Sequence, residues 1–303
     1  MNTTQRALQM IKERVPSLEF STEEPLSSHT SFKIGGAAEL MLFPKTIAEL
    51  RAALEVTHAL ELKPLILGAG TNVLAPDEGL RGVVIVTRGC LEGIEKVSPT
   101  RLVAMAGTTM AKLAMTAQAE GLSGLEFAHG IPGTVGGGIY MNAGAYGGEM
   151  KQVAYQTEFM FFDGTMNIMR LDEQELGYRT STFQKRDCVI LRTWFDLVPG
   201  DKEEIKKTMQ TLAEKRRASQ PLELPSAGSF FKRPEGAFAG TLIDRAGLKG
   251  YRVGGAAVSE KHAGFVVNLG GATRADVEQL MHDVQKTVLE KSGFSLEPEV
   301  KFL

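Results

Sequence analysis

The sequence has little of what a disulfide framework, a metal site or a membrane span requires. Its 303 residues include only two cysteines, Cys90 and Cys188, which are far apart and lack metal-ligand spacing. We interpret them as free thiols in a reducing compartment. The five histidines form no His-x-His or His-x-x-x-His pair, so we predict no metal. No apolar run reaches the roughly 18 residues of a transmembrane helix, and the charged N-terminal segment does not resemble a secretory signal.

The sequence also lacks an excess of charge of either sign. Its formal net charge is -2, and its isoelectric point is near 6.3. Such a chain has no overall field that would attract nucleic acid or an anionic membrane surface. We therefore expect neither kind of partner. A monomeric, cytoplasmic protein is expected.

What the chain does contain is an alternation of helix and strand patterns, which predicts a mixed α/β or α+β fold. The length favours two or three domains. The spacing of Thr46 and Glu49 predicts a capping box at the start of a helix. Asp163 and Gly164 predict a hairpin turn, and a long helix is expected between Thr273 as N-cap and the C-terminal Gly293.

The first candidate binding segment is a glycine loop that follows the short apolar run at residues 65–67. It consists of Gly68, Ala69, Gly70, Thr71 and Asn72. A Gly-x-Gly sequence after a strand is typical of dinucleotide-binding folds, but the sixth position is Val73 and a proline follows soon after. A nicotinamide-binding Rossmann site is therefore disfavoured. An ordinary tight turn remains an alternative if this segment is considered alone.

A second, denser glycine segment changes that balance. Eight of the 33 glycines lie within residues 130–148. The loop itself comprises Gly130, Ile131, Pro132, Gly133, Thr134, Gly136, Gly137 and Gly138, together with Val135. Ordered glycines cost conformational entropy, whereas backbone N–H groups without a neighbouring Cβ form a good cradle for a pyrophosphate. Two such loops indicate a dinucleotide clamped between two subdomains; purely structural packing of the glycines is the alternative.

Six segments in the same order resemble the UDP-N-acetylenolpyruvoylglucosamine reductase family. They are TSFKIGG at residues 30–36, GAGTN at 68–72, GIPGTVGGG at 130–138, YRTSTF at 178–183, AGSFF at 227–231 and EPEV at 297–300. The resemblance covers nearly the whole chain. The segment between Arg179 and Ser229 is short, as in the compact subtype of the family that lacks an extra loop carrying a substrate-binding tyrosine.

The resemblance implies an α+β protein with an FAD-binding fold of the vanillyl-alcohol-oxidase type plus a C-terminal substrate domain. The expected division is an FAD-binding subdomain over residues 1–85, a second over 86–217, and a substrate-binding domain over 218–303, with a final strand at 296–303 that returns to the first. Some relatives of this fold attach the flavin to a histidine in the first glycine loop. Here Thr71 and Asn72 stand in that loop, so the resemblance implies non-covalent FAD, with NADPH as co-substrate.

The family reaction transfers a hydride from NADPH through FAD to C3 of an enolpyruvyl group, which leaves an enolate to be protonated at C2. Arg179 has a planar fork suited to the substrate carboxylate. Ser229 is the expected proton donor to C2. Glu299 would act as a protonated acid that donates to the carboxylate, a role that requires a raised pKa.

Each of these three assignments depends on the resemblance. Without it, Arg179 would be a surface ion-pair residue, Ser229 a loop hydroxyl and Glu299 a solvated strand residue. Glu297 shares the expected strand face of Glu299. We choose Glu299 because the family motif places its acid directly before Val300.

The substrate diphosphate requires basic partners. Residues 215–261 contain nine Lys and Arg against four Asp and Glu, although a solvated charged surface would show the same excess. The expected substrate-binding residues are Tyr178, Arg217, Lys232, Arg233 and His262. The exact contact of Arg233 is open, because many relatives have asparagine there. The stretch at residues 250–255, together with Asn268, is expected to line the substrate or flavin pocket.

Two other functions compete with this reading. A flavin oxidase of the same fold would return electrons to oxygen, but it needs a base rather than a group that protonates an enolate. A non-catalytic flavin- or nucleotide-binding module is the second alternative. We expect NADPH to share the pocket of the sugar substrate, since no second dinucleotide fingerprint is present.

Overall fold

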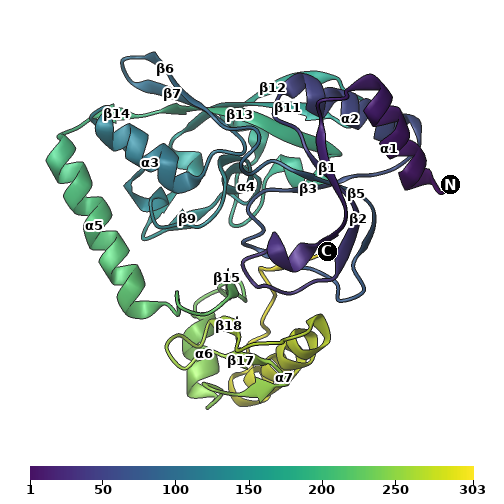
Figure 1. Ribbon diagram of the computed structural model, residues 1–303. Coiled ribbons are helices and arrows are strands. Elements are labelled where there is room, and N and C mark those ends of the chain that lie inside the picture. Colours follow the sequence, from purple (N-terminus) through teal and green to yellow (C-terminus); the bar gives the residue numbers. More distant parts are fainter. The chain divides into compact units, whose positions relative to one another are not determined.

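The computed structural model describes all 303 residues, and the chain divides into two compact units that are each built from several segments (Figure 1). The first unit comprises Met1–Glu23, Glu39–Ala69 and Arg81–Glu214. The second comprises Glu24–Ala38, Gly70–Leu80 and Lys215–Leu303. Two short N-terminal segments therefore belong to the same unit as the C-terminal part of the chain.

One sheet of the first unit has four strands in the order β1-β2-β5-β3, of which β3 and β5 are parallel. The elements of this layer are α1 (Thr3–Arg14), β1 (Glu19–Pro25), β2 (Ala37–Phe43), α2 (Ile47–Ala59), β3 (Leu65–Leu67) and β5 (Leu80–Val86). Ile11 of α1 and Leu54 of α2 are buried in one core with Leu40 of β2 and Ile85 of β5. The two helices thus stabilise the sheet through their apolar stripes.

The second sheet of this unit is antiparallel, with the strand order β12-β11-β13-β7-β6. Its strands are β6 (Ile94–Ser98), β7 (Arg101–Met105), β11 (Ala154–Phe161), β12 (Met166–Arg170) and β13 (Cys188–Asp196). The predicted hairpin between β11 and β12 is confirmed, and Gly164 has the positive φ of +87° that its turn requires. Phe159 and Phe183 pack edge to face in the core, with ring centroids 5.5 Å apart.

Short elements complete the first unit. They are α3 (Met110–Ala119), α4 (Val135–Tyr140), the two-stranded pairs β8 (Leu122–Ser123) with β14 (Val198–Pro199) and β9 (Gly144–Ala145) with β10 (Gly148–Glu149), and 3-10 turns at Glu126–Ala128, Met150–Gln152, Leu171–Gln174 and Thr182–Lys185. Helix α5 (Lys202–Ser219) contains the boundary between the units, which lies between Glu214 and Lys215.

The second unit has an antiparallel sheet in the order β15-β18-β17-β16. Its elements are β15 (Ser226–Ser229), α6 (Ala239–Arg245), β16 (Arg252–Val253), β17 (Ala256–Val258), β18 (Phe265–Asn268) and α7 (Arg274–Ser292), with a 3-10 turn at Leu26–Ser28 and a parallel pair formed by β4 (Val73–Leu74) and β19 (Lys301–Phe302). Phe32 and Leu74 are buried in its core with Phe230, Val284 and Val300. This burial explains why the two N-terminal segments belong to this unit.

The long C-terminal helix forms as predicted. The hydroxyl of Thr273 accepts a hydrogen bond from the N–H of Asp276, and Gly293 ends the helix with φ +74°. At α2 the prediction is half right. Thr46 caps the helix by accepting from the N–H of Glu49, but the Glu49 carboxylate accepts from the N–H of Lys45 instead of closing a capping box.

The prediction of one continuous strand over residues 296–303 is wrong. Only Lys301–Phe302 pair as a strand, and Pro298 forms an isolated bridge with Phe231. Proline has no N–H to donate, so it interrupts a hydrogen-bonded ladder. Leu296 and Val300 are nevertheless both buried, whereas Glu297 is exposed. None of the helices of the chain combines the length and apolar character needed to cross a bilayer.

Candidate active site

The two glycine loops meet inside the first unit. A Cβ added at Gly68 would lie 2.7 Å from the hydroxyl oxygen of Thr134, so only glycine allows this approach. Thr134 caps the short helix α4, and its hydroxyl accepts a hydrogen bond from the N–H of Gly137 at 3.3 Å. Segments that are far apart in the sequence therefore lie against each other, as the prediction of a site built from both loops requires.

Part of the glycine density in the second loop has a structural cause. A Cβ at Gly136 would lie 3.0 Å from the Cβ of Ala106, and one at Gly138 would lie 2.8 Å from the sulfur of Met110. The packing alternative thus explains these two positions. Gly137 is exposed, however, and would meet no atom closer than the Thr134 hydroxyl at 3.5 Å. The open face of the loop is at Gly137 and not at its neighbours.

A buried polar atom without a partner lies directly before this loop. Nδ1 of His129 is buried and accepts or donates no hydrogen bond. Such an atom costs free energy unless a group outside the chain satisfies it. Its place next to Gly130 is consistent with a polar ligand at the loop.

The second half of the first glycine loop belongs to the second unit. Gly70 has φ +59°, and a Cβ there would overlap the carbonyl oxygen of His29. The Asn72 side chain donates to the carbonyl oxygen of Glu299 at 3.3 Å, and its own carbonyl accepts from the N–H of Lys301 at 3.0 Å. The loop residue Asn72 is therefore fixed directly to the C-terminal segment that carries the predicted acid.

Arg179 lies in a tight turn of the first unit. Gly177 and Thr180 pair with each other across the turn, and Arg179 has φ +56°. A long side chain rarely adopts this left-handed conformation, and such strain is concentrated at functional sites. The guanidinium donates to the carbonyl oxygen of Gly144 at 3.3 Å, and its Cζ lies 5.4 Å from the ring centre of the exposed Tyr178.

Ser229 and Glu299 are brought together in the second unit. Ser229 is the last residue of β15, pairs with Phe265 and is exposed. The next carbonyl along the chain, that of Phe230, accepts a hydrogen bond from the N–H of Glu299 at 2.8 Å. The backbone of Glu299 thus lies against the residue that follows Ser229, although 70 positions separate the two predicted catalytic residues in the sequence.

Glu297 and Glu299, which share one strand face in the sequence-based prediction, differ in their contacts and exposure. The Glu297 carboxylate forms an ion pair with Lys232, and its carbonyl oxygen accepts from the Lys232 N–H at 2.8 Å. The Glu297 side chain is 70% exposed, whereas Glu299 is half-buried. Lys232, expected to bind substrate, is therefore occupied by an internal partner.

The remaining predicted substrate residues lie at different places in the fold. The guanidinium of the exposed Arg233 stacks over Phe238, 4.4 Å from the ring centre. Arg217 is exposed on α5, and its carbonyl oxygen accepts from the Lys261 ammonium at 2.7 Å. These contacts connect Arg233 with Phe238 and Arg217 with Lys261, and they do not connect the two arginines with each other.

His262 is held as a neutral ring. Burial lowers its pKa, and its Nδ1 accepts a hydrogen bond from the N–H of Gly264 at 3.1 Å. The proton of the neutral imidazole is therefore on Nε2, which makes that atom a donor. Asn268 has a structural role, because its buried side-chain amide donates to the carbonyl oxygen of Phe32 and accepts from the N–H of Gly270.

Sequence reasoning missed the side chains that hold the Arg179 turn. Asn142 is buried, has φ +41° and donates to the carbonyl oxygen of Gly177 at 2.9 Å. Gln184 donates to the carbonyl oxygen of Arg179 at 3.1 Å. The signal for Asn142 was an asparagine among glycines, since asparagine tolerates the left-handed region.

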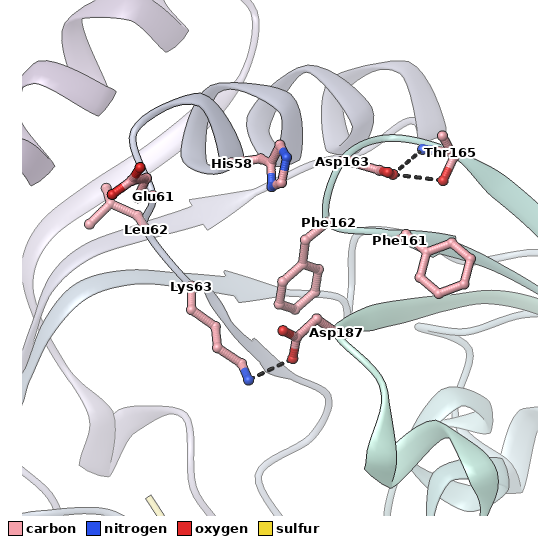
Figure 2. Close-up of a pocket in the computed structure, with 9 residues that line it drawn as sticks. All are labelled: His58, Glu61, Leu62, Lys63, Phe161, Phe162, Asp163, Thr165 and Asp187. Carbon is pink, nitrogen blue, oxygen red and sulfur yellow. Dashed lines mark hydrogen bonds and ion pairs between the residues drawn. The ribbon is translucent and has the colours of Figure 1, made fainter.

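An open pocket lies away from all the predicted site residues (Figure 2). It is lined by His58, Glu61, Leu62, Lys63, Phe161, Phe162, Asp163, Thr165 and Asp187. Figure 2 shows Lys63 directed at Asp187, with which it forms an ion pair, and Asp163 closing the β11–β12 turn through Thr165. Lys63, Asp187 and Asp163 therefore serve one another or the local turn.

Comparison with known proteins agrees with this geometry. The sequence profile of the FAD binding domain matches residues 38–169, which include both glycine loops. The profile of the UDP-N-acetylenolpyruvoylglucosamine reductase C-terminal domain matches residues 220–303, which include Ser229 and Glu299. The chain thus combines an FAD-binding domain of the expected type with this C-terminal domain, and the predicted α+β fold is confirmed.

Full-length relatives extend the match. The UDP-N-acetylenolpyruvoylglucosamine reductase of Lachnoclostridium phytofermentans is 46% identical over 98% of this chain and 96% of its own. That of Caldanaerobacter subterraneus subsp. tengcongensis is 45% identical over 97% and 96%. The crystal structure of the Thermus caldophilus reductase has a TM-score of 0.77 at 35% identity and covers 94% of this chain and 98% of that one. The chain therefore belongs to the UDP-N-acetylenolpyruvoylglucosamine reductase family.

Proposed function

We propose that this protein reduces the enolpyruvyl group of UDP-N-acetylglucosamine enolpyruvate to UDP-N-acetylmuramate, with FAD as cofactor and NADPH as electron donor, in peptidoglycan precursor synthesis. The observation that carries the proposal is the hydrogen bond from the N–H of Glu299 to the carbonyl oxygen of Phe230, the residue after Ser229, in a chain 46% identical to a relative named for this reduction. An acid and a hydroxyl carried by adjoining segments suit protonation of an enolate.

The residues present fit FAD. In the first unit, Gly68 packs closely against Thr134, Gly137 is exposed with room where a Cβ would stand, and the unpartnered His129 nitrogen directly precedes the second loop in the sequence. Thr71 and Asn72 continue the first loop. When bound, the flavin supplies the hydride for C3 of the substrate. The glycine loops supply N–H donors for its pyrophosphate, because backbone amides without a Cβ can approach closely.

The substrate carboxylate gains negative charge when C3 is reduced. Arg179 has a side chain suited to it, because a guanidinium offers two parallel donors to the two carboxylate oxygens. The left-handed backbone of Arg179 supports this role, since the strained turn is held by buried hydrogen bonds. Ser229 gives its hydroxyl proton to C2, and the protonated Glu299 donates to the carboxylate.

For the diphosphate and the sugar we propose Arg217, Arg233, Lys232, Tyr178 and His262. His262 would contribute a neutral donor at Nε2, because burial lowers its pKa. Lys232 would have to leave Glu297, or share it, to meet a phosphate oxygen. Arg233, which is exposed, stacks on Phe238.

The finer assignments follow the same resemblance. We propose a monomeric, cytoplasmic enzyme. We also propose that it is of the compact subtype, because a 3-10 turn, β13, β14, α5 and β15 take up the chain between Arg179 and Ser229. We also propose the three-part division at residues 85/86 and 217/218. The parallel pairing of Lys301–Phe302 with Val73–Leu74 supports a return of the C-terminal end to the N-terminal part.

The proposed activity is tested by NADPH oxidation. The purified, flavin-loaded protein should oxidise NADPH rapidly only when the enolpyruvyl sugar is added, with UDP-N-acetylmuramate as product. Sugar-independent NADPH oxidation coupled to oxygen uptake would instead indicate an oxidase. Flavin binding without either reaction would indicate a non-catalytic module.

Non-covalent attachment of FAD is tested by denaturation. Acid precipitation should release all the yellow colour into the supernatant, because neither Thr71 nor Asn72 offers a nucleophile of the histidine type. Quantifying flavin in both fractions measures this directly. Colour that remains in the washed pellet would contradict the prediction, and digestion of the pellet would then locate the attachment.

A further inference from the structure

The backbone on both sides of Arg179 is held by amide side chains that no part of the chemistry uses directly. Within the turn, the N–H of Gly177 donates to the carbonyl of Thr180 at 3.1 Å, and the N–H of Thr180 donates back at 3.4 Å. These bonds close the turn but do not fix how it is oriented on the rest of the unit.

Asn142 fixes the entry to the turn. Its Nδ2 donates to the carbonyl oxygen of Gly177 at 2.9 Å and to the Glu149 carboxylate at 2.8 Å, and its Oδ1 accepts from the N–H of Lys151 at 2.9 Å. Only 1% of Asn142 is exposed. Every polar atom of this side chain is therefore used, and its conformation is determined by its partners.

Gln184 fixes the exit from the turn. Its Nε2 donates to the carbonyl oxygen of Arg179 at 3.1 Å and to that of Tyr140 at 2.8 Å. Tyr140 is the last residue of α4, and Asn142 follows two positions later. The peptide groups on either side of Tyr178 and Arg179 are thus both tied to the C-terminal end of α4.

We propose that Asn142 and Gln184 are positioning residues for Arg179: by fixing the two peptide groups of a strained turn, they aim the guanidinium at the substrate carboxylate. The inference rests on the proposed function of Arg179. A guanidinium accelerates a reaction only if it is already oriented when charge develops, and a displacement of about 1 Å can cost about 10²-fold in rate.

The test uses Asn142→Asp in the flavin-loaded enzyme. Aspartate has a similar shape, tolerates the left-handed backbone and keeps an acceptor for the Lys151 N–H, but it removes both donors. Stopped-flow reoxidation of the pre-reduced enzyme by the enolpyruvyl sugar should slow by about 10²-fold. Reduction by NADPH should change by less than about twofold, because the substrate carboxylate assigned to Arg179 takes no part in that half-reaction.

Two further variants separate positioning from folding. Ser181→Ala is the matched control, because the buried Ser181 hydroxyl donates to the carbonyl oxygen of Tyr140, which keeps Gln184 as a second donor. It should leave both half-reactions near wild type. Gln184→Met keeps the side-chain length and removes the donor, and it should slow reoxidation by about tenfold, the effect of roughly one hydrogen bond to the turn. If Asn142→Asp does not fold, this variant carries the test.

A double-mutant cycle decides whether the amides act through Arg179. Arg179→Ala should be slow, and adding Asn142→Asp to it should cause less than about twofold further loss. Additive losses, or wild-type reoxidation in both amide variants while Arg179→Ala is slow, would overturn the positioning role alone. Wild-type reoxidation in Arg179→Ala would overturn the proposed function of Arg179 and this inference with it.

Discussion

Replacement of Ser229 by alanine should leave reduction of the flavin by NADPH near normal and slow reoxidation by the enolpyruvyl sugar by several orders of magnitude. The loss should equal or exceed the roughly 10²–10⁴-fold typical of a positioned general acid. The reason is that the variant lacks only the hydroxyl that protonates C2. Stopped-flow spectroscopy of the two half-reactions measures the two rates separately.

Ser229→Ala should remove the hydroxyl without disturbing the fold. Ser229 is exposed at the end of β15, so its hydroxyl contributes little to the core, and alanine fits the same strand. Ser229→Cys should retain more activity than alanine, because a thiol can also donate a proton. Ser226→Ala, at the start of the same strand, is the matched control and should behave like wild type. Equal slowing of both half-reactions in Ser229→Ala would show that Ser229 is structural.

Local signals predicted the regular elements well. The Thr273 cap and the terminal Gly293 have the predicted roles in α7, because each depends on residues within a few positions. The β11–β12 hairpin was predictable for the same reason. Where another partner competes, as for the Glu49 carboxylate that accepts from the N–H of Lys45 and from the hydroxyl of the distant Ser17, the local pattern failed.

The geometry of the candidate site could not be predicted from the sequence. No pattern indicates that Arg179 has a positive φ or that its turn is hydrogen-bonded by Asn142 and Gln184, which lie outside it in the sequence. Nor does the sequence show that Phe32 and Leu74 pack into the same core as Val284. That burial places two N-terminal segments in the second unit, and only long-range apolar contacts determine it.

Of the two C-terminal glutamates, Glu299 should be the one on which substrate-dependent flavin reoxidation depends. Glu299→Gln keeps a hydrogen-bond donor of similar shape, whereas Glu299→Ala leaves no donor beside the developing negative charge. Substrate-dependent reoxidation should therefore rank wild type first, then the glutamine variant, then the alanine variant. The alanine loss should be on the order of 10²-fold or more, as for other lost transition-state donors.

Glu297→Ala is the matched control for this prediction. Its carboxylate is largely exposed and paired with Lys232, and an exposed ion pair contributes little to stability. The substitution frees the Lys232 ammonium, so it should alter substrate affinity or thermal stability modestly and spare the chemical step. The backbone supports this choice, because the N–H of Glu299 binds the carbonyl next to Ser229, while Glu297 binds Lys232 further along. If pre-reduced Glu297→Ala is crippled in stopped-flow reoxidation while Glu299→Ala reacts normally, the acid has been assigned to the wrong residue of the segment.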